Sequence, residues 1–476
     1  MRSTRVMMVL AGAVAAWCAA SLAVIAVPAF GAAARADSWG KAIEVPGLAR
    51  LSAGHGGMLN LVSCSSPGNC SAGGNYTDRL GHQQAFVVSE KNGSWGKAIE
   101  VPRLAALNTG EDARVVSLSC GSAGNCAAGG FYSSHRIRAF VVSEKNGSWG
   151  KAMQVPGAAA LSGAGGYSEV DALSCASAGN CAAGGSYSSD GDQQAFVVSE
   201  KNGSWGRAIK VPGLAALGNG TLTGIDSVSC ASVGNCAVTG HYDNIAPEAF
   251  VVSETNGSWG TAIEVPGSAA FGTATFPSVS CASAGNCAAA GYSGSPITDA
   301  SFGPLVVSEK NGTWGNAIGV HGTTGSGRSA AVSVSCASAG NCLAGGDYAS
   351  SIDNPYQAFL VREKNGSWGT AFEVPGLAAL NVDGNADVAS VSCKTARNCA
   401  AGGTYRDGSG HQQAFVASEN NGSWGKAIEV PGSAALNTGG SAQIMSVSCT
   451  SARYCAVVGN AVDSSGNEVA FIVSRT

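Results

Sequence analysis

Short runs of alternating apolar and polar residues recur along the chain from about residue 38 onwards. In one stretch, Arg114–Cys120 reads RVVSLSC, Cys126–Tyr132 reads CAAGGFY and Ala139–Glu144 reads AFVVSE. These runs are rich in β-branched, aromatic or small residues and are bounded by turn residues, which predicts three short β-strands. A fourth strand is expected over Trp149–Val155. It ends at Pro156, because proline is tolerated on an outer edge strand.

The connections within this stretch predict antiparallel pairing. Gly124-Asn125 provides turn chemistry between the first and second strands. Asn146-Gly147 is the pair that favours a two-residue hairpin between the third and fourth strands. The second and third strands are joined by a loop whose sequence varies. We therefore expect a sheet of four antiparallel strands, A to D in chain order.

The same pattern recurs about every 55 residues. Ser-Trp-Gly, once Thr-Trp-Gly, marks strand D, with tryptophan at positions 39, 95, 149, 205, 259, 314, 368 and 424. A Cys-x5-Cys pair joins strands A and B in every unit: Cys64 and Cys70, Cys120 and Cys126, Cys175 and Cys181, Cys230 and Cys236, Cys281 and Cys287, Cys336 and Cys342, Cys393 and Cys399, and Cys449 and Cys455. Repeated four-stranded units are typical of a β-propeller.

The phase of the repeats at the two ends separates a closed propeller from a linear β-solenoid. The repeats open with a lone strand D over Ser38–Pro46 and close with strands A to C over Gln443–Ser474. The first residues would thus complete the last unit, which a linear stack does not require. We expect an all-β fold, an eight-bladed propeller over residues 37–476.

Positions within the repeat predict close packing between blades. Serine directly precedes the first cysteine of every unit, and an aliphatic residue precedes that serine, as in Val62 and Leu118. Strand B is mostly alanine and glycine, which allows neighbouring sheets to approach closely. Strand C carries a phenylalanine in seven units and Leu305 in the remaining one: Phe86, Phe140, Phe196, Phe250, Phe359, Phe415 and Phe471.

Residues 1–36 read as an export signal. Arg2 and Arg5 precede a long apolar run, and Ala34-Arg35-Ala36 offers a cleavage site with small residues. Because the run is long for a signal, an uncleaved membrane anchor is the alternative. We expect a secreted or cell-surface protein, with no membrane span after removal of the signal.

Export and the regular spacing make the sixteen repeat cysteines candidates for one disulfide per blade. Zinc is the alternative, but each pair would need two further ligands, and none repeats with it. We therefore expect no metal and no cofactor. The net charge of −4 and a charged fraction of 12% argue against a basic nucleic-acid-binding surface.

The hairpin between strands C and D resembles the Asp-box of sialidase-like propellers. Ser89–Trp95 reads SEKNGSW and shares the serines, glycine and tryptophan of that motif, but its turn is one residue shorter and lacks the aspartate. In that family the box is structural, so the resemblance implies a propeller and no activity. The unit as a whole, with SCASAGNCAAGG at Ser174–Gly185, is also similar to uncharacterised Cys-pair repeat proteins exported by high-GC bacteria.

Divergence between the units points to a binding surface. The A–B and C–D turns are nearly invariant, whereas the B–C and D–A loops at the other end of the strands vary, which suits recognition. Drift in tolerant loops is the alternative reading. The candidate binding residues on this side are Glu111, Asp112, Glu169, Asp171, Asp226, Asp383 and Asp387, with Tyr76, Tyr132, Tyr187, Tyr242, Tyr348 and Tyr405.

No catalytic set can be assembled from the sequence. The histidines are scattered in loop positions, and Asp190-Gly191-Asp192 lacks the spacing of a calcium loop. We therefore expect a monomeric binding or scaffold module for a surface polysaccharide or protein, rather than an enzyme. The alternatives are a secreted glycan hydrolase or lyase with paired acids at the channel mouth, and a purely structural envelope protein.

Overall fold

The first complete repeat folds into the predicted antiparallel sheet. In the computed structural model, β2 (Gly57–Ser66), β3 (Asn69–Thr77) and β4 (Gln83–Lys91) pair in that order, and the short strands β5 (Ser94–Trp95) and β6 (Ile99–Glu100) pair with β4. The structure describes residues 38–163, 165–189, 191–218, 222–243, 247–294, 303–323, 329–349 and 354–476. The predicted export signal, residues 1–36, lies outside them.

The other repeats follow the same order of strands. The first strands are β7 (Ala113–Ser122), β12 (Ser168–Ser177), β17 (Thr223–Ser232), β22 (Ala274–Ser283), β27 (Ser329–Ser338), β32 (Asp387–Thr395) and β37 (Ala442–Cys449). The second strands are β8 (Asn125–Ser134), β13 (Asn180–Ser189), β18 (Asn235–Asp243), β23 (Asn286–Ser293), β28 (Asn341–Tyr348), β33 (Asn398–Arg406) and β38 (Cys455–Val462). The third strands are β9 (Arg136–Lys145), β14 (Asp192–Lys201), β19 (Pro247–Thr255), β24 (Gly303–Lys310), β29 (Gln357–Lys364), β34 (Gln412–Asn420) and β39 (Glu468–Arg475).

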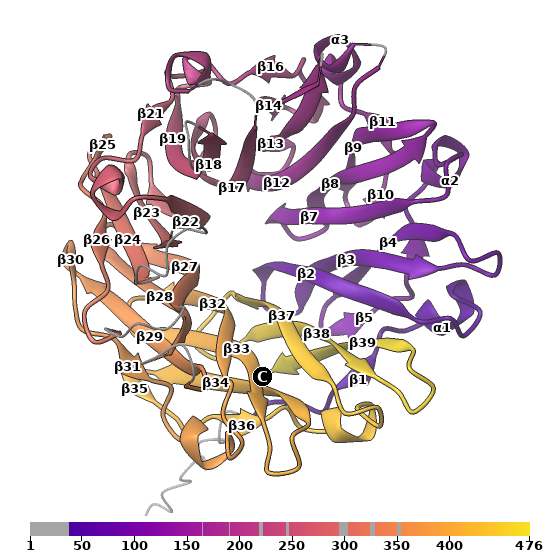
Figure 1. Cartoon of the computed structure of the whole chain (residues 1–476). Coiled ribbons are helices and arrows are strands. Elements are labelled where there is room, and N and C mark those ends of the chain that lie inside the picture. The colour runs from indigo at the N-terminus through magenta and orange to yellow at the C-terminus, as the bar shows by residue number, and fades with distance from the viewer. Residues whose placement is uncertain are drawn as a thin grey trace, which may run out of the picture. The chain divides into compact units, whose positions relative to one another are not determined.

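These sheets stand side by side around a centre lined by the first strand of each repeat (Figure 1). Within Ser38–Thr476 the chain is therefore an eight-bladed β-propeller, which confirms the predicted fold class. The predicted closure is also confirmed, because β1 (Ile43–Glu44) pairs antiparallel with β39 and completes the last blade. A single parallel bridge between Gly57 and Val469 joins the first and last sheets.

The outermost strand differs from the prediction of one continuous strand D. It is split into two pieces in each blade: β10 (Ser148–Trp149) and β11 (Met153–Gln154), β15 (Ser204–Trp205) and β16 (Ile209–Lys210), β20 (Ser258–Trp259) and β21 (Ile263–Glu264), β25 (Thr313–Trp314) and β26 (Ile318–Gly319), β30 (Ser367–Trp368) and β31 (Phe372–Glu373), and β35 (Ser423–Trp424) and β36 (Ile428–Glu429). Between the two pieces, a backbone amide donates to the preceding blade instead of to its own sheet. In the second blade, the amide of Ala152 donates to the carbonyl of Pro102 at 2.8 Å. An outer ring of backbone hydrogen bonds replaces pairing within the blade at this point.

The D–A connections contain short helices, where the sequence predicts loops without regular structure. They are α1 (Leu48–Leu51), α2 (Leu104–Leu107), α3 (Ala158–Ser162) and the 3₁₀ turns η1 (Leu214–Ala216), η2 (Ser268–Phe271), η3 (Leu377–Ala379) and η4 (Ser433–Ala435). The Val-Pro-Gly segment before α1 places Gly47 at a φ of 80°, which starts the turn. Where the turn begins with leucine, that side chain is buried, as Leu48 and Leu104 illustrate. Its packing holds the connection against the blade.

The serine before each first cysteine bonds one blade to the next. Ser63 Oγ accepts the amide of Cys120 at 3.0 Å, and Ser119 Oγ accepts that of Cys175 at 3.0 Å. Ser448 accepts the amide of Cys64 at 2.9 Å and so closes the ring. The remaining serines accept the amide of the first cysteine in the next blade in the same way: Ser174, Ser229, Ser280, Ser335 and Ser392. This inner ring explains why the serine is invariant between repeats.

The apolar core lies between blades. Each cluster combines residues of two neighbouring sheets, such as Ala85 and Val87 of one blade with Leu118 and Phe140 of the next. The exceptional Leu305 is matched by Phe276 on the first strand of its own blade, where the other blades have a smaller residue, and both are buried in one cluster. In this blade the aromatic ring is therefore on strand A, whereas in the other blades it is on strand C.

All sixteen predicted cysteines form disulfides within the described residues, one in each blade. Their pairing is the predicted one, and the Cα atoms of Cys64 and Cys70 are 4.0 Å apart. The two cysteines of a pair are also direct partners in the sheet ladder. A bond that closes so short a loop contributes only about 2 kcal/mol, so the disulfides reinforce hairpins that packing already holds.

A buried glutamate near the end of the third strand faces the preceding blade. Glu144 is 4% exposed and accepts hydrogen bonds from Ser89 at 2.8 Å and Ser71 at 3.2 Å. The same Ser89 accepts the indole N–H of Trp149 at 3.0 Å. The last blade differs, since Arg475 stands at the glutamate position and is 2% exposed. The repeated Ser-Glu pair is therefore an element of the interface between blades.

Burial of these carboxyl groups makes stability depend on pH. It raises the pKa of Glu90, Glu144, Glu200, Glu254, Glu309 and Glu363 above the ordinary value. The folded chain then holds protons more tightly than the unfolded chain, so this contribution is complete below the unfolded pKa and is lost as pH rises through the raised values. We expect the free energy of unfolding in denaturant to be larger at about pH 5 than at about pH 8.

A matched variant isolates these groups. The double variant Glu200→Gln with Glu309→Gln has no ionisable group at two of these positions. Its free energy of unfolding should therefore change less over the same pH interval. The His241 pKa is raised mainly by its hydrogen bond to Asp226, and it changes stability in the same direction. Equal pH profiles for the double variant and the natural chain would contradict the assignment.

Candidate binding surface on the variable face

Hydrogen bonds sort the connections into two groups at opposite ends of the strands. The A–B and C–D turns contact each other, as where the amide of Gly93 donates to the carbonyl of Gly68 at 2.9 Å. The B–C and D–A loops also contact each other, since the amide of Gln83 donates to the carbonyl of Glu111 at 2.9 Å. We call the end that carries the B–C and D–A loops the variable face.

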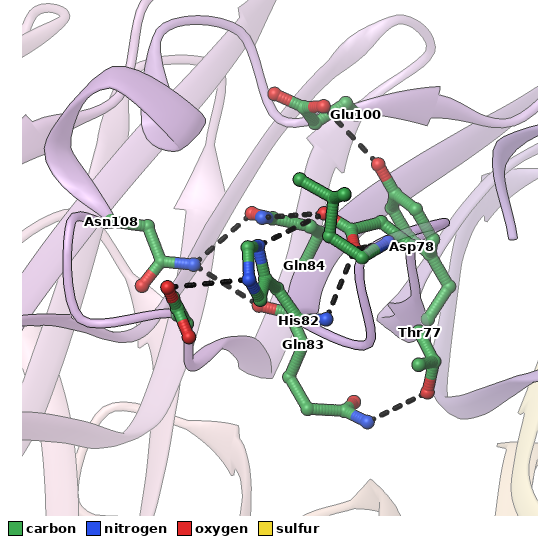
Figure 2. A network of polar contacts seen from close by, with 10 residues as sticks. Thr77, Asp78, His82, Gln83, Gln84, Glu100 and Asn108 are labelled. Atoms are coloured by element: carbon green, nitrogen blue, oxygen red, sulfur yellow. Dashed lines mark hydrogen bonds and ion pairs between the residues drawn. The ribbon is translucent and has the colours of Figure 1, made fainter.

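Side-chain contacts hold the variable loop after β3 in place (Figure 2). In the loop after β3, Asp78 Oδ1 accepts the amides of Leu80 and His82 at 2.8 and 3.0 Å. His82 also lies between Asp78 and Glu111, with nitrogen–oxygen distances of 3.6 and 3.2 Å. The same aspartate-closed turn recurs at Asp407 and Asp463. Loops that differ in sequence therefore share a fixed frame.

The variable face is hollowed over three consecutive blades. A cavity of about 540 Å³ lies between the ends of β23, β27, β28, β32 and β33. Its polar lining includes Asp347, Asp387 and Arg406, together with Tyr292 and Tyr356, which are both half-buried. A concave site with aromatic rings and a few convergent polar groups is typical of small-molecule and carbohydrate binding.

The aspartate in this cavity is fixed by its neighbours. Asp387 Oδ1 accepts the amide of Thr404 at 2.8 Å and also the Thr404 hydroxyl. The guanidinium-bearing Arg406 is exposed at the end of β33, and its amide donates to Asn381 at 3.1 Å. The cavity thus offers a fixed acceptor and a cationic donor on one strand pair, with Tyr292 from β23 and Tyr356 from the connection before β29.

A second polar cluster lies at the same end of the strands, over β12, β13, β17 and β18. Ser186 donates to Glu169 at 3.3 Å and to Asp171 at 3.0 Å. On the next blade, Asp226 Oδ1 lies 2.8 Å from Nδ1 of His241. The structure therefore brings together three of the predicted acids, Glu169, Asp171 and Asp226.

Burial and mutual repulsion act on the carboxyl groups of this cluster. Desolvation by burial, followed by the charge of Glu169, raises the pKa of Asp171 well above its ordinary value. Asp226 from the neighbouring blade adds to this shift, so the two carboxyl groups interact across the interface. A carboxyl group with a raised pKa, close to a second carboxyl and its histidine partner, is a candidate for proton transfer.

The structure places most of the predicted tyrosines in the core. Tyr76, Tyr132, Tyr187, Tyr242 and Tyr405 are each at most 5% exposed, and Tyr348 is half-buried. Tyr76 packs edge-on against Phe86 at 6.3 Å between ring centroids, and its hydroxyl donates to Glu100 at 3.1 Å. We leave the five buried rings out of the proposed site because a ligand would not reach them, and Tyr348 does not line the cavity.

The remaining predicted acids lie apart from the two clusters. Glu111 is exposed and pairs with His82, and Asp112 pairs with Arg114 at 3.0 Å. Asp383 is exposed in the connection before β32. The cavity residues Tyr292, Asp347, Tyr356 and Arg406 were not among the predicted sites, although they fall in or beside the variable segments. Their assembly depends on the contact between blades, which no local pattern reveals.

Among the residues that the structure describes, no group of three or more His, Cys, Asp or Glu side chains is arranged to hold a metal ion. In the same part of the chain, no helix is both long enough and apolar enough to cross a membrane.

The fold defines a β-propeller whose connections vary in sequence at one end of the strands. No protein-family model and no curated protein sequence matches the chain. Among solved structures, Sqt1 from Chaetomium thermophilum is 11% identical, with a TM-score of 0.51 over 92% of this chain and 100% of that chain.

More distant matches are named as propellers or glycan-active enzymes. The β-propeller domain of the trilobed protease from Pyrococcus furiosus is 7% identical, with a TM-score of 0.44 over 79% of this chain and 98% of that chain. A PL25 ulvan lyase is 10% identical, with a TM-score of 0.41 over 83% of this chain and 95% of that chain. At 11% identity, the match to Sqt1 supports the fold alone.

Proposed function

We propose that this chain is an exported binding module that holds a surface polysaccharide on its variable face. The observation that carries the proposal is the cavity of about 540 Å³ lined by Tyr292, Tyr356, Asp347, Asp387 and Arg406. Tyrosine rings offer apolar faces for sugar rings, and the charged and amide groups offer partners for hydroxyls. A disulfide in each blade supports an oxidising, extracellular location.

The test is retention on a panel of immobilised glycans and cell-wall fractions. Tyr356→Ala combined with Arg406→Ala removes an aromatic face and a cation from the cavity rim. We expect binding to weaken by about tenfold or more, since each well-packed contact contributes on the order of 1–2 kcal/mol. Lys97→Ala, an exposed change on the opposite face, is the matched control and should bind normally.

Two outcomes would overturn the polysaccharide proposal. The first is the absence of retention on every glycan, with capture of a defined surface protein instead, which would favour the protein-binding alternative. The second is unchanged glycan binding by the cavity variant, which would place the site elsewhere on the molecule.

A glycan hydrolase or lyase is the second candidate, and one observation favours it. Asp171 and Asp226 come from neighbouring blades, interact electrostatically, and lie with His241 at the same end of the strands. Release of reducing ends or unsaturated products from a bound glycan would support catalysis. Loss of that release in Asp171→Asn, with glycan binding retained, would assign the proton transfer to this pair.

A further inference from the structure

The interface between the sixth and seventh blades carries an arginine at the position of the strand C serine. Arg362 stands where the other blades have serine, at positions equivalent to Ser89 and Ser253. Its Nη2 donates to Oε1 of Glu419 at 2.7 Å, and its Nη1 donates to the carbonyl of Ala396. Glu419 is 3% exposed and Arg362 25% exposed at their side chains, so the ion pair is partly buried.

The equivalent space between the fourth and fifth blades is an open cavity of about 260 Å³. Ser253, Ala284 and Glu309 line it, and they correspond by repeat position to Arg362, Ala396 and Glu419. The carboxylate and the alanine that bind the guanidinium in one interface are thus present in the other, where no arginine fills the space.

The cavity between the fourth and fifth blades also has an unused acceptor. Glu309 is 5% exposed, and its Oε1 accepts a hydrogen bond from Ser253 at 3.3 Å. Its Oε2 has no hydrogen-bond partner among the described residues. Oε2 of Glu419 also has no partner there, so the two interfaces differ at Oε1, which accepts a guanidinium N–H at 2.7 Å in Glu419 and only a hydroxyl at 3.3 Å in Glu309. A charged donor at Glu309 would therefore be stabilising. Glu254 lines the same cavity. None of the described residues that line it is a lysine or an arginine.

A similar cavity of about 550 Å³ lies between the first and second blades, but its charge is different. Glu90 and Glu144 line it together with Lys91 and Lys97. In the cavity between the fourth and fifth blades, Thr255 stands in place of Lys91. The absence of lysine from that lining makes it the more acidic of the two and the better site for a cation.

We propose that the cavity formed by Ser253, Ala284 and Glu309 binds the guanidinium group of an arginine side chain from a partner protein. A guanidinium would donate to the Glu309 carboxylate and to the Ala284 carbonyl, as Arg362 does within the chain. The site lies among the A–B and C–D turns, so it is separate from the variable face and independent of the glycan proposal.

The first test uses a crystal of the natural chain soaked with N-acetyl-arginine amide. We expect the guanidinium plane to lie between Glu309 and Ala284, with the citrulline analogue, which has the same shape and no charge, leaving the cavity free. Ser253→Arg should fill the cavity from within and exclude the probe, while keeping the melting temperature at or above that of the natural chain. Absence of the probe from the natural cavity overturns the proposal.

The second test removes the arginine from the interface between the sixth and seventh blades. Arg362→Ser leaves Glu419 without its cation, and we expect a lower melting temperature that rises again in a saturable way with agmatine. The matched change Arg362→Ser with Glu419→Gln removes the carboxylate and should lose this rescue. If agmatine raises the melting temperature of both variants equally, the carboxylate does not select the guanidinium and the proposal fails. The soaked crystal decides the case if Arg362→Ser does not fold.

Discussion

A chain that begins at Gly47 is expected to lose most of its stability relative to one that begins at Ser38. The shorter chain lacks β1, whose Ile43 pairs with Ile472 in the last blade. It also loses the hydrogen bond from the amide of Ala42 to the carbonyl of Pro431 at 2.7 Å, and the one from the Trp39 indole to Ser418 at 3.1 Å. Val45, 3% exposed, would leave the core at a cost of about 2 kcal/mol.

The sum of these losses is about 5 kcal/mol or more when each net hydrogen bond contributes about 1 kcal/mol. Denaturant unfolding followed by tryptophan fluorescence measures it, with the chain beginning at Ser38 as control. Size-exclusion chromatography should also detect association, because removal of β1 exposes the edge of β39. A monomeric truncated chain that unfolds within about 0.5 kcal/mol of the control would show that closure contributes little.

Phe140→Ala is expected to destabilise the fold by about 3–5 kcal/mol. The ring is fully buried between two blades and packs with Val115 and Leu118, so its removal leaves a cavity that the β-sheets cannot close. Phe140→Leu should cost less, about 1–2 kcal/mol. Equilibrium unfolding in guanidinium chloride gives each value.

A double variant tests the compensation found in the fifth blade. There, Phe276 and Leu305 occupy the positions that Val115 and Phe140 occupy in the second blade. Val115→Phe with Phe140→Leu should therefore recover about 1 kcal/mol or more of the loss caused by Phe140→Leu alone. Strictly additive effects of the two changes would contradict this account of the core.

The sequence predicted the repeat unit and its closure because both depend on local signals. Alternation around Cys120, the turn at Asn146-Gly147 and the phase of the terminal strands identify strands without knowledge of their neighbours. The disulfide pairs followed from the same hairpins. What the sequence did not predict is the break in the outer strand, because the amide of Ala152 bonds to Pro102 in the preceding blade.

The candidate sites were harder to predict for the same reason. Tyr187 reads as a loop residue beside a variable segment, yet it is fully buried because α3 and its connection cover the end of β13. Glu169 and Asp171 were predicted, but their proximity to Asp226 depends on how two blades face each other. The cavity residues Tyr292 and Arg406 are spaced far apart in sequence and meet only through that packing.

The pairing of β1 with β39 determines how the propeller responds to a pulling force. The two strands are antiparallel and Trp39 bridges Arg475, so residues near both ends of the described range Ser38–Thr476 lie together on the outer strand pair. Tension applied between the ends would load the hydrogen bonds one at a time from Trp39 inwards, as in opening a zipper, rather than all at once in shear. A tether at one end alone would leave this seam unloaded.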